Sequence, residues 1–110
     1  MKKFLVLYRS PISGAQQMAN STPEHAKAGM EAWMAWAGRA GSAIVDLGSP
    51  LGESVTVGGS TPTGTGFIGG YSVLQAESMG AVKKHLDGHP HLMMPGFTIE
   101  VLEYLPIPGM

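Results

Sequence analysis

The side chains best suited to acid–base chemistry in this chain are its four histidines and a small number of polar partners. His25 follows the sequence Ser-Thr-Pro-Glu, which is typical of the start of a helix. The positive end of a helix dipole disfavours an imidazolium, so a histidine there is available as a neutral base near pH 7. We predict that His25 is a catalytic acid or base and that Asp46 orients it. The simpler interpretation makes His25 a solvated first-turn residue and Asp46 a turn former.

Other polar side chains suit substrate binding. Tyr8 and Arg9 end the first apolar segment of the chain, and His89 and His91 follow the second predicted helix. An arginine at such a position can bind an anionic group of a substrate. We therefore predict a substrate-binding set made of Tyr8, Arg9, His89 and His91.

The histidine spacing also raises the question of a metal site. His85 and His89 have the spacing of one helical turn, but Gly88 between them indicates that the helix ends first. His89 and His91 flank Pro90, and the chain contains no HExxH motif. We predict no metal and no cofactor. The segment 58–66, rich in glycine and threonine, lacks the Lys-Ser/Thr ending of a phosphate loop and is interpreted as a flexible hairpin connection.

The helix that must position His25 extends from Thr22 to Gly41. Thr22 is the expected N-cap, Pro23 the first helical residue and Gly41 the residue after the end. An apolar stripe recurs at three- and four-residue spacing and predicts the buried face. It consists of Ala26, Met30, Trp33, Ala37 and Ala40, widened by Met34. We expect Trp33 and Trp36 to anchor the core or an interface.

Four strands and a second helix complete the predicted organisation. The first strand is apolar on both faces, as expected for the centre of a covered sheet. A loop is expected over 10–21, and a short extended piece over 53–57 should extend the second strand beyond Pro50 or lie as a side ribbon. Ser78 should cap the second helix and Gly88 should end it. The predicted strands are 2–9, 43–48, 67–76 and 97–105, and the second helix is 79–87.

The order β-α-β-β-α-β predicts an α+β, ferredoxin-like sandwich over one domain, residues 1–110. Its antiparallel sheet carries both helices on one face, so the other face is bare and apolar. Two copies meeting sheet to sheet would bury that face, which predicts a homodimer. Right-handed crossovers bring several polar residues toward one end of the sheet. They are Tyr8, Arg9, His25, Asp46, His85, His89 and His91.

Composition limits the classes of function. The chain has 110 residues, a net charge of −1 and no cysteine, which excludes disulfides and thiolate chemistry. The sequence has no excess of basic residues that would indicate binding to nucleic acid, and no apolar run approaches the length of a membrane span. We expect a cytoplasmic protein whose partners are a second copy of itself and an unknown small molecule, with neither nucleic acid nor membrane among them.

Several short motifs, in order, resemble the YCII-related proteins of the dimeric α+β barrel superfamily, near the DGPF-type subgroup. They are FLVLYR in the first strand, Pro23-Glu24-His25, Gly48-Ser49-Pro50, Phe67-Ile68-Gly69-Gly70 and Gly88-His89-Pro90-His91. The resemblance implies a ferredoxin-like subunit, a homodimer, and a His–Asp site in which His25 takes the histidine position. Where that family often has Asp-Pro before an aromatic residue, this chain has His89-Pro90-His91.

The function expected from these features is small-molecule binding by a dimeric α+β barrel protein, with an enzyme that uses His25 as the first hypothesis. A proton transfer or a hydrolytic step fits the candidate residues. The alternatives are a non-catalytic accessory or regulatory protein linked to a sigma factor, as in DGPF-type relatives, and an enzyme like the cofactor-free monooxygenases of the superfamily.

Overall fold

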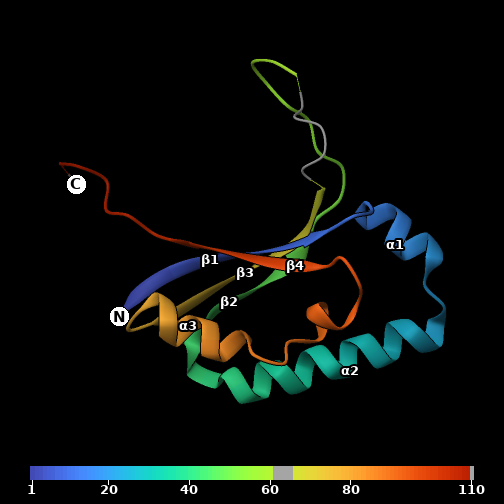
Figure 1. Cartoon of the computed structure of the whole chain (residues 1–110), viewed down its shortest axis with the longest axis horizontal. Coiled ribbons are helices and arrows are strands. Elements are labelled where there is room, and N and C mark those ends of the chain that lie inside the picture. The colour runs from blue at the N-terminus through green and yellow to red at the C-terminus, as the bar shows by residue number, and fades with distance from the viewer. Residues whose placement is uncertain (61–65, 110) are drawn as a thin grey trace.

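Strand β1 lies at the centre of the sheet. The computed structural model describes residues 1–60 and 66–109, which form a four-stranded sheet in the order β2-β3-β1-β4 (Figure 1). Strand β1 pairs antiparallel with β3 and β4, and β2 pairs antiparallel with β3. The strands are β1 (Lys2–Ser10), β2 (Ile44–Pro50), β3 (Phe67–Ala76) and β4 (Thr98–Glu103). This is the strand order of the predicted ferredoxin-like α+β fold.

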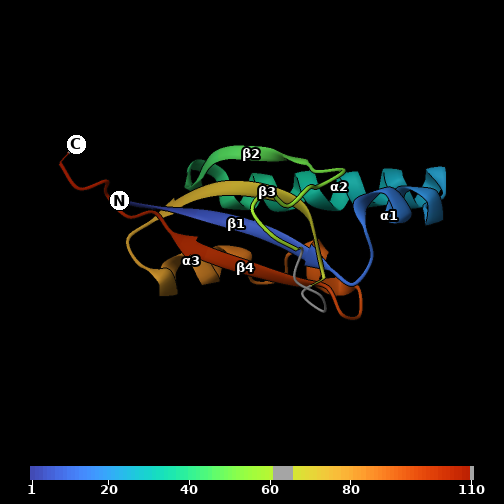
Figure 2. The same cartoon turned by 90° about the horizontal axis from the view of Figure 1, so that it is seen from above.

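The two longer helices lie on the same face of the sheet, as predicted (Figures 1 and 2). The α-helices are α1 (Gly14–Asn20), α2 (Pro23–Ala40) and α3 (Met79–Leu86), and the short 3₁₀ helices are η1 (Gly41–Ala43) and η2 (Pro90–Met93). In the described residues, no helix is both long enough and apolar enough to cross a membrane.

The sequence signals at the helix ends are confirmed. The Thr22 hydroxyl accepts a hydrogen bond from the backbone N–H of His25, and Pro23 is the first helical residue of α2. Gly41, with a positive φ of 55°, follows its last residue. The Ser78 hydroxyl caps α3 in the same way.

Three sequence-based expectations about the elements are wrong. The predicted loop over 10–21 contains α1, which is capped by the Ser13 hydroxyl and buries none of its residues. Strand β2 continues to Pro50, and the backbone N–H of Leu51 still bonds to Gly69. The piece 53–57 forms no strand and no helix. Of the expected hairpin connection over 58–66, residues 61–65 lie outside the described part of the chain.

The core lies between the helices and one face of the sheet. Its buried side chains come from β1, β3, α2 and α3, and they are Phe4, Val6, Tyr8, Trp36, Ala40, Leu74, Ala76, Val82 and Leu86. The Trp36 indole N–H donates to the His85 carbonyl (2.7 Å) and so links α2 to α3. The predicted stripe of α2 is therefore displaced, because its buried centre contains Trp36, whereas Met30 and Met34 are exposed.

The opposite face of the sheet has no helix over it (Figure 1). Residues that alternate with the core positions of β1, β3 and β4 form this face, and its apolar members include Leu5, Leu7, Val73 and Leu102. The segment after β2 and the tail after β4 extend away from the sheet on this side (Figure 1). Both carry highly exposed apolar side chains, namely Val55, Val57, Leu105 and Ile107.

Candidate functional site

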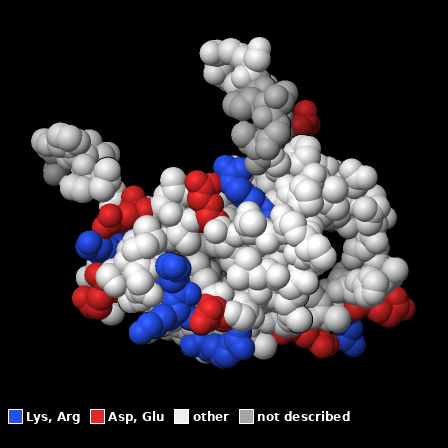
Figure 3. Space-filling view, in the orientation of Figure 1, with Lys and Arg blue, Asp and Glu red and all other residues white. Residues whose placement is uncertain are grey.

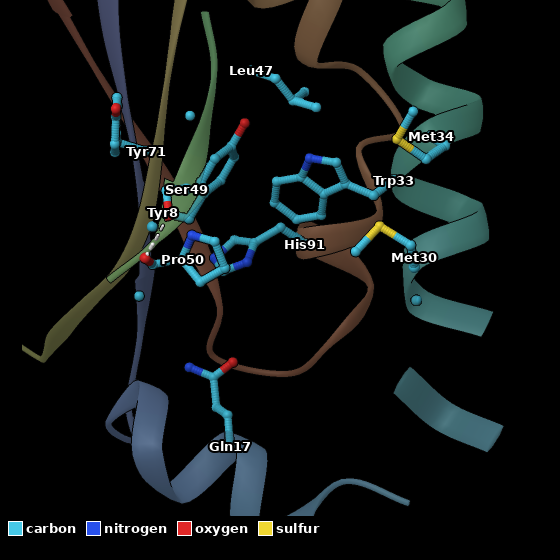
Figure 4. A pocket seen from close by; sticks show the side chains of 14 residues that line it. Tyr8, Gln17, Met30, Trp33, Met34, Leu47, Ser49, Pro50, Tyr71 and His91 are labelled. Carbon is cyan, nitrogen blue, oxygen red and sulfur yellow. Dashed lines mark hydrogen bonds between the residues drawn. The ribbon is translucent and has the colours of Figure 1, made fainter. Parts of the chain in front are cut away.

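A pocket of about 320 Å³ lies between the sheet, α1 and the middle of α2 (Figure 4). Its walls are mostly apolar, and Trp33 extends from α2 toward Tyr8 on β1. The ring centroids of these two residues are 4.7 Å apart in an edge-to-face arrangement. The lining residues are Tyr8, Gln17, Gly29, Met30, Trp33, Met34, Leu47, Gly48, Ser49, Pro50, Gly69, Gly70, Tyr71 and His91. A concave, apolar site of this size suits a small organic molecule.

Tyr8 provides a fixed polar group in the pocket. Its hydroxyl is 2.8 Å from the Ser72 hydroxyl, which donates to the Leu47 carbonyl (2.7 Å). Burial raises the pKa of Tyr8 to about 12, against the smaller effect of the Ser72 hydrogen bond. The phenol is therefore neutral at physiological pH and acts by hydrogen bonding.

His91 is the histidine among the described residues that line the pocket. One ring nitrogen, Nε2, lies 2.8 Å from the Arg9 carbonyl, and a carbonyl only accepts, so Nε2 carries the hydrogen. Burial lowers the pKa of His91, while backbone hydrogen bonds to Arg9 and Thr98 oppose that shift. In the neutral ring the lone pair is therefore on Nδ1, and this is the atom that gives the imidazole the chemistry of a general base.

His89 is fully buried behind this wall. Its ring packs against Trp33, Trp36 and Tyr8, with centroid separations of 4.5, 4.3 and 5.1 Å. The Nδ1 atom accepts from the backbone N–H of His91 (3.0 Å), so the hydrogen of the neutral ring is on Nε2. That Nε2 atom has no hydrogen-bond partner among the described residues. Burial lowers the pKa of His89 to about 4, helped by the charges of His91 and Arg39.

No lysine, arginine, aspartate or glutamate is among the described residues that line the pocket. In Figure 3, most basic side chains gather at the lower left of the view, and the right-hand part of the view is mostly uncharged except for acidic and basic side chains along its lower edge. A charged ligand would find no opposite charge to offset its desolvation. In the described part of the chain, no group of three histidine, aspartate or glutamate side chains is arranged to hold a metal ion.

His25 lies in the first turn of α2 and is exposed. It precedes the pocket residue Gly29 by four positions, so both lie on the same side of the helix. His25 is not one of the pocket's lining residues. The start of the helix was predicted correctly, whereas the catalytic role of His25 stays a prediction.

Asp46 lies away from this end of the sheet. It pairs with Val73, which pairs with Leu5, whereas Pro50 is at the level of Tyr8. Along β1, the level of Asp46 (at Leu5) and the level of Pro50 (at Tyr8) are three residues apart, which is roughly 10 Å. The Asp46 carboxylate instead accepts from the Gly48 N–H (2.9 Å) and the Tyr71 hydroxyl (3.4 Å).

The placement of Asp46 at the end of the sheet is therefore wrong, because β2 does not end at Gly48. The hydroxyl partner, Tyr71, also faces away from α2 (Figure 4), since the next residue, Ser72, faces the core. Within one chain, Asp46 and His25 lie on opposite faces of the sheet.

Arg9 also lies on the face without helices. Its guanidinium forms an ion pair with Glu100 (2.7 Å), and the neighbours of Glu100, Ile99 and Val101, pack against the core. Of the predicted binding residues, the structure thus brings Tyr8 and His91 into the pocket and places His89 directly behind them. It separates Arg9 from them.

Sequence reasoning missed several residues that shape the pocket. Gln17 was assigned to a loop, but α1 places its amide against the Ser10 hydroxyl (2.9 Å) at one end of the pocket. The pair Ser13 and Gln16 at the start of α1 is the available signal, since the serine caps the Gln16 N–H. Ser72 shows no such signal, because only the pairing of β3 with β1 brings it to Tyr8.

No family model matches this chain, and no curated protein matches it in sequence. Among solved structures, the chain is similar to 5-chloro-2-hydroxyhydroquinone dehydrochlorinase (TftG) from Burkholderia phenoliruptrix in complex with 2,5-dihydroxybenzoquinone. The TM-score is 0.53 at 20% identity, covering 94% of this chain and 93% of that chain. The two proteins share the α+β fold over nearly their whole length.

Proposed function

We propose that the protein binds a small, uncharged organic molecule in the pocket between α2 and the sheet. The observation that carries this proposal is the pocket itself, with apolar walls, no charged lining residue and the polar groups of Tyr8 and His91. TftG supports a ligand with a single ring, because it holds 2,5-dihydroxybenzoquinone in a protein of the same fold.

The chemistry that fits this site is proton transfer at a bound substrate. His91 is the nearer base, because it lines the pocket and burial favours its neutral form. His25 is the base expected from the YCII resemblance, and it lies one helical turn beyond Gly29. A ligand that extends past Gly29 would reach it, whereas a ligand confined to the pocket would meet only His91.

Non-catalytic binding is the second candidate function. It is favoured by the position of Asp46, which is on the other face of the sheet and bonded to Gly48 and Tyr71. A pocket without a carboxylate in its lining can hold a ligand without transforming it. Recovery of the ligand chemically unchanged after prolonged incubation supports this function, and a new product supports the enzyme.

The proposal also includes a homodimer formed through the face without helices, as in the YCII-related proteins. Support comes from the uncovered Leu5 and Leu102 and from the exposed apolar segments that extend on the same side. Light scattering is expected to give twice the chain mass at micromolar concentration, and a monomer there contradicts the dimer. The cytoplasmic location stays a prediction.

Thermal-shift measurements with neutral single-ring alcohols test ligand binding. A ligand at 100 times its Kd should raise the free energy of unfolding by about 2.7 kcal/mol. The variant Tyr8→Phe should lose part of this gain, whereas the matched change Tyr104→Phe, in the exposed tail, should keep it. If no compound of the panel stabilises the protein, or if Tyr8→Phe responds like the wild type, the pocket proposal is wrong.

The base is tested once a substrate that turns over is known. Replacing His91 or His25 by alanine should abolish turnover if that histidine is the base. The variant His85→Ala is the control, because its side chain is exposed on α3. Full turnover by the His25→Ala variant contradicts the assignment made from the family resemblance.

A further inference from the structure

The hydrogen bonds around Ser72 determine which way the Tyr8 hydroxyl is polarised. A serine hydroxyl has one hydrogen, and the Leu47 carbonyl, 2.7 Å away, can only accept it. The Ser72 oxygen must therefore act as acceptor toward Tyr8, which is 2.8 Å away. It follows that Tyr8 donates its single hydrogen to Ser72.

The Tyr8 oxygen is consequently an acceptor toward the pocket. Tyr8 is a neutral phenol, since burial holds its pKa at about 12, and its only hydrogen is engaged with Ser72. What remains for a ligand is a lone pair on the phenol oxygen. Figure 4 shows that the hydroxyl end of the Tyr8 ring points toward Leu47, and both residues line the pocket.

We propose that this pocket selects an uncharged ligand that presents an O–H or N–H hydrogen to Tyr8, and discriminates against one that presents a carbonyl. This inference rests on the proposed function. A carbonyl at the same position would place two acceptors against each other and leave both without a hydrogen. An unsatisfied buried group of this kind weakens binding roughly tenfold or more.

A matched pair of probes tests the inference by isothermal titration calorimetry. The probes 1-phenylethanol and acetophenone have the same carbon skeleton, and they present a hydroxyl and a carbonyl, respectively. The wild-type protein should bind the alcohol at least about tenfold more tightly. Equal affinities, or tighter binding of the ketone, overturn the inference and leave the proposed function standing. Failure of both probes and of the wider panel overturns the proposed function and this inference with it.

The variant Ser72→Ala tests the cause of the preference. It frees the hydrogen of Tyr8, which can then turn to the ketone, so the preference should fall to within about threefold through tighter ketone binding. Ser42→Ala, at an exposed position, is the matched control and should keep the wild-type preference. A Ser72→Ala variant that keeps the full preference overturns the inference.

The variant Tyr8→Phe gives a second measurement if Ser72→Ala does not fold. It removes the phenol oxygen and keeps the ring, so the two probes should bind with similar affinities. If Tyr8→Phe keeps the wild-type preference, a group other than Tyr8 accepts the hydrogen bond from the hydroxyl of the alcohol probe. That result overturns the inference.

Discussion

The two halves of α2 differ in what they contact, although one apolar pattern extends through both. The second half is built into the core, where Trp36 is 1% exposed and donates to the His85 carbonyl of α3. The first half is exposed along its whole length, and Met30 is 63% exposed at the edge of the pocket. Trp33 stands between the halves and contacts both His89 and the pocket. An apolar stripe on a helix can therefore serve as core at one end and as a binding wall at the other.

Alanine substitutions at Trp36 and Met30 are expected to give the largest difference in folding stability between the two halves of α2. Trp36→Ala should lower the free energy of unfolding by about 3–5 kcal/mol, since it leaves a cavity in the core and removes the link to α3. Met30→Ala should change it by less than about 0.5 kcal/mol. Chemical denaturation measures both values, and similar losses for the two variants would show that the first half also carries stability.

A smaller loss of folding stability is expected when the pH is lowered, because His89, at the junction of the two halves of α2, is buried in its neutral form. Its pKa is about 4 in the folded protein, against an ordinary value of 6.5 in the unfolded chain. Between these values the unfolded chain binds more protons, so stability is complete above pH 6.5 and decreases as the pH falls. The loss should reach about 3 kcal/mol near pH 4. The lowered pKa of His91 acts in the same direction.

The variant His89→Asn isolates this contribution, because its amide oxygen can still accept from the His91 N–H and does not titrate. Denaturation curves between pH 7 and pH 4 should show a much smaller loss for this variant, on the order of 1 kcal/mol. His85→Asn, changed at an exposed position, should keep the wild-type pH dependence. If the curves of His89→Asn and wild type are parallel, His89 is not the group that titrates.

The smallest effect compares two glycines, one in each half. No atom lies within 4 Å of an added Cβ at Gly29 or Gly38, so alanine should stabilise either position by about 1 kcal/mol. Only Gly29 lines the pocket, so Gly29→Ala alone should weaken ligand binding. Denaturation and titration of the two variants check this, and equal ligand affinities would place the ligand away from the first half of α2.

Much of the fold could be predicted because its signals are local. The start of α2 depends on the adjacent residues Thr22 and Pro23, and β3 was predicted with its observed bounds from an apolar run. The central position of β1 followed from its two apolar faces. Short α1 could not be predicted from periodicity, since it buries none of its residues and only its Ser13 cap marks it.

The candidate site could be predicted only in part. Tyr8 and His91 lie together in the pocket wall, as strand direction and helix order predict, because both bring their segments to one end of the sheet. Asp46 and Arg9 were placed with them on the same ground, but the direction of a side chain across a sheet depends on register. The irregular pairing of β2 around Asp46 removes the simple alternation from which such a direction would be read.

The sequence by itself determined that four strands and two longer helices form, their order in the fold and the start of the helix that carries His25, since each depends on residues close together in the chain. Only the tertiary structure decided which part of the α2 stripe becomes core and which becomes pocket wall. It also decided that Ser72 meets Tyr8, across 64 residues of chain, and so fixes the polarity of its hydroxyl. Contacts of that kind depend on register and packing, which no local pattern encodes.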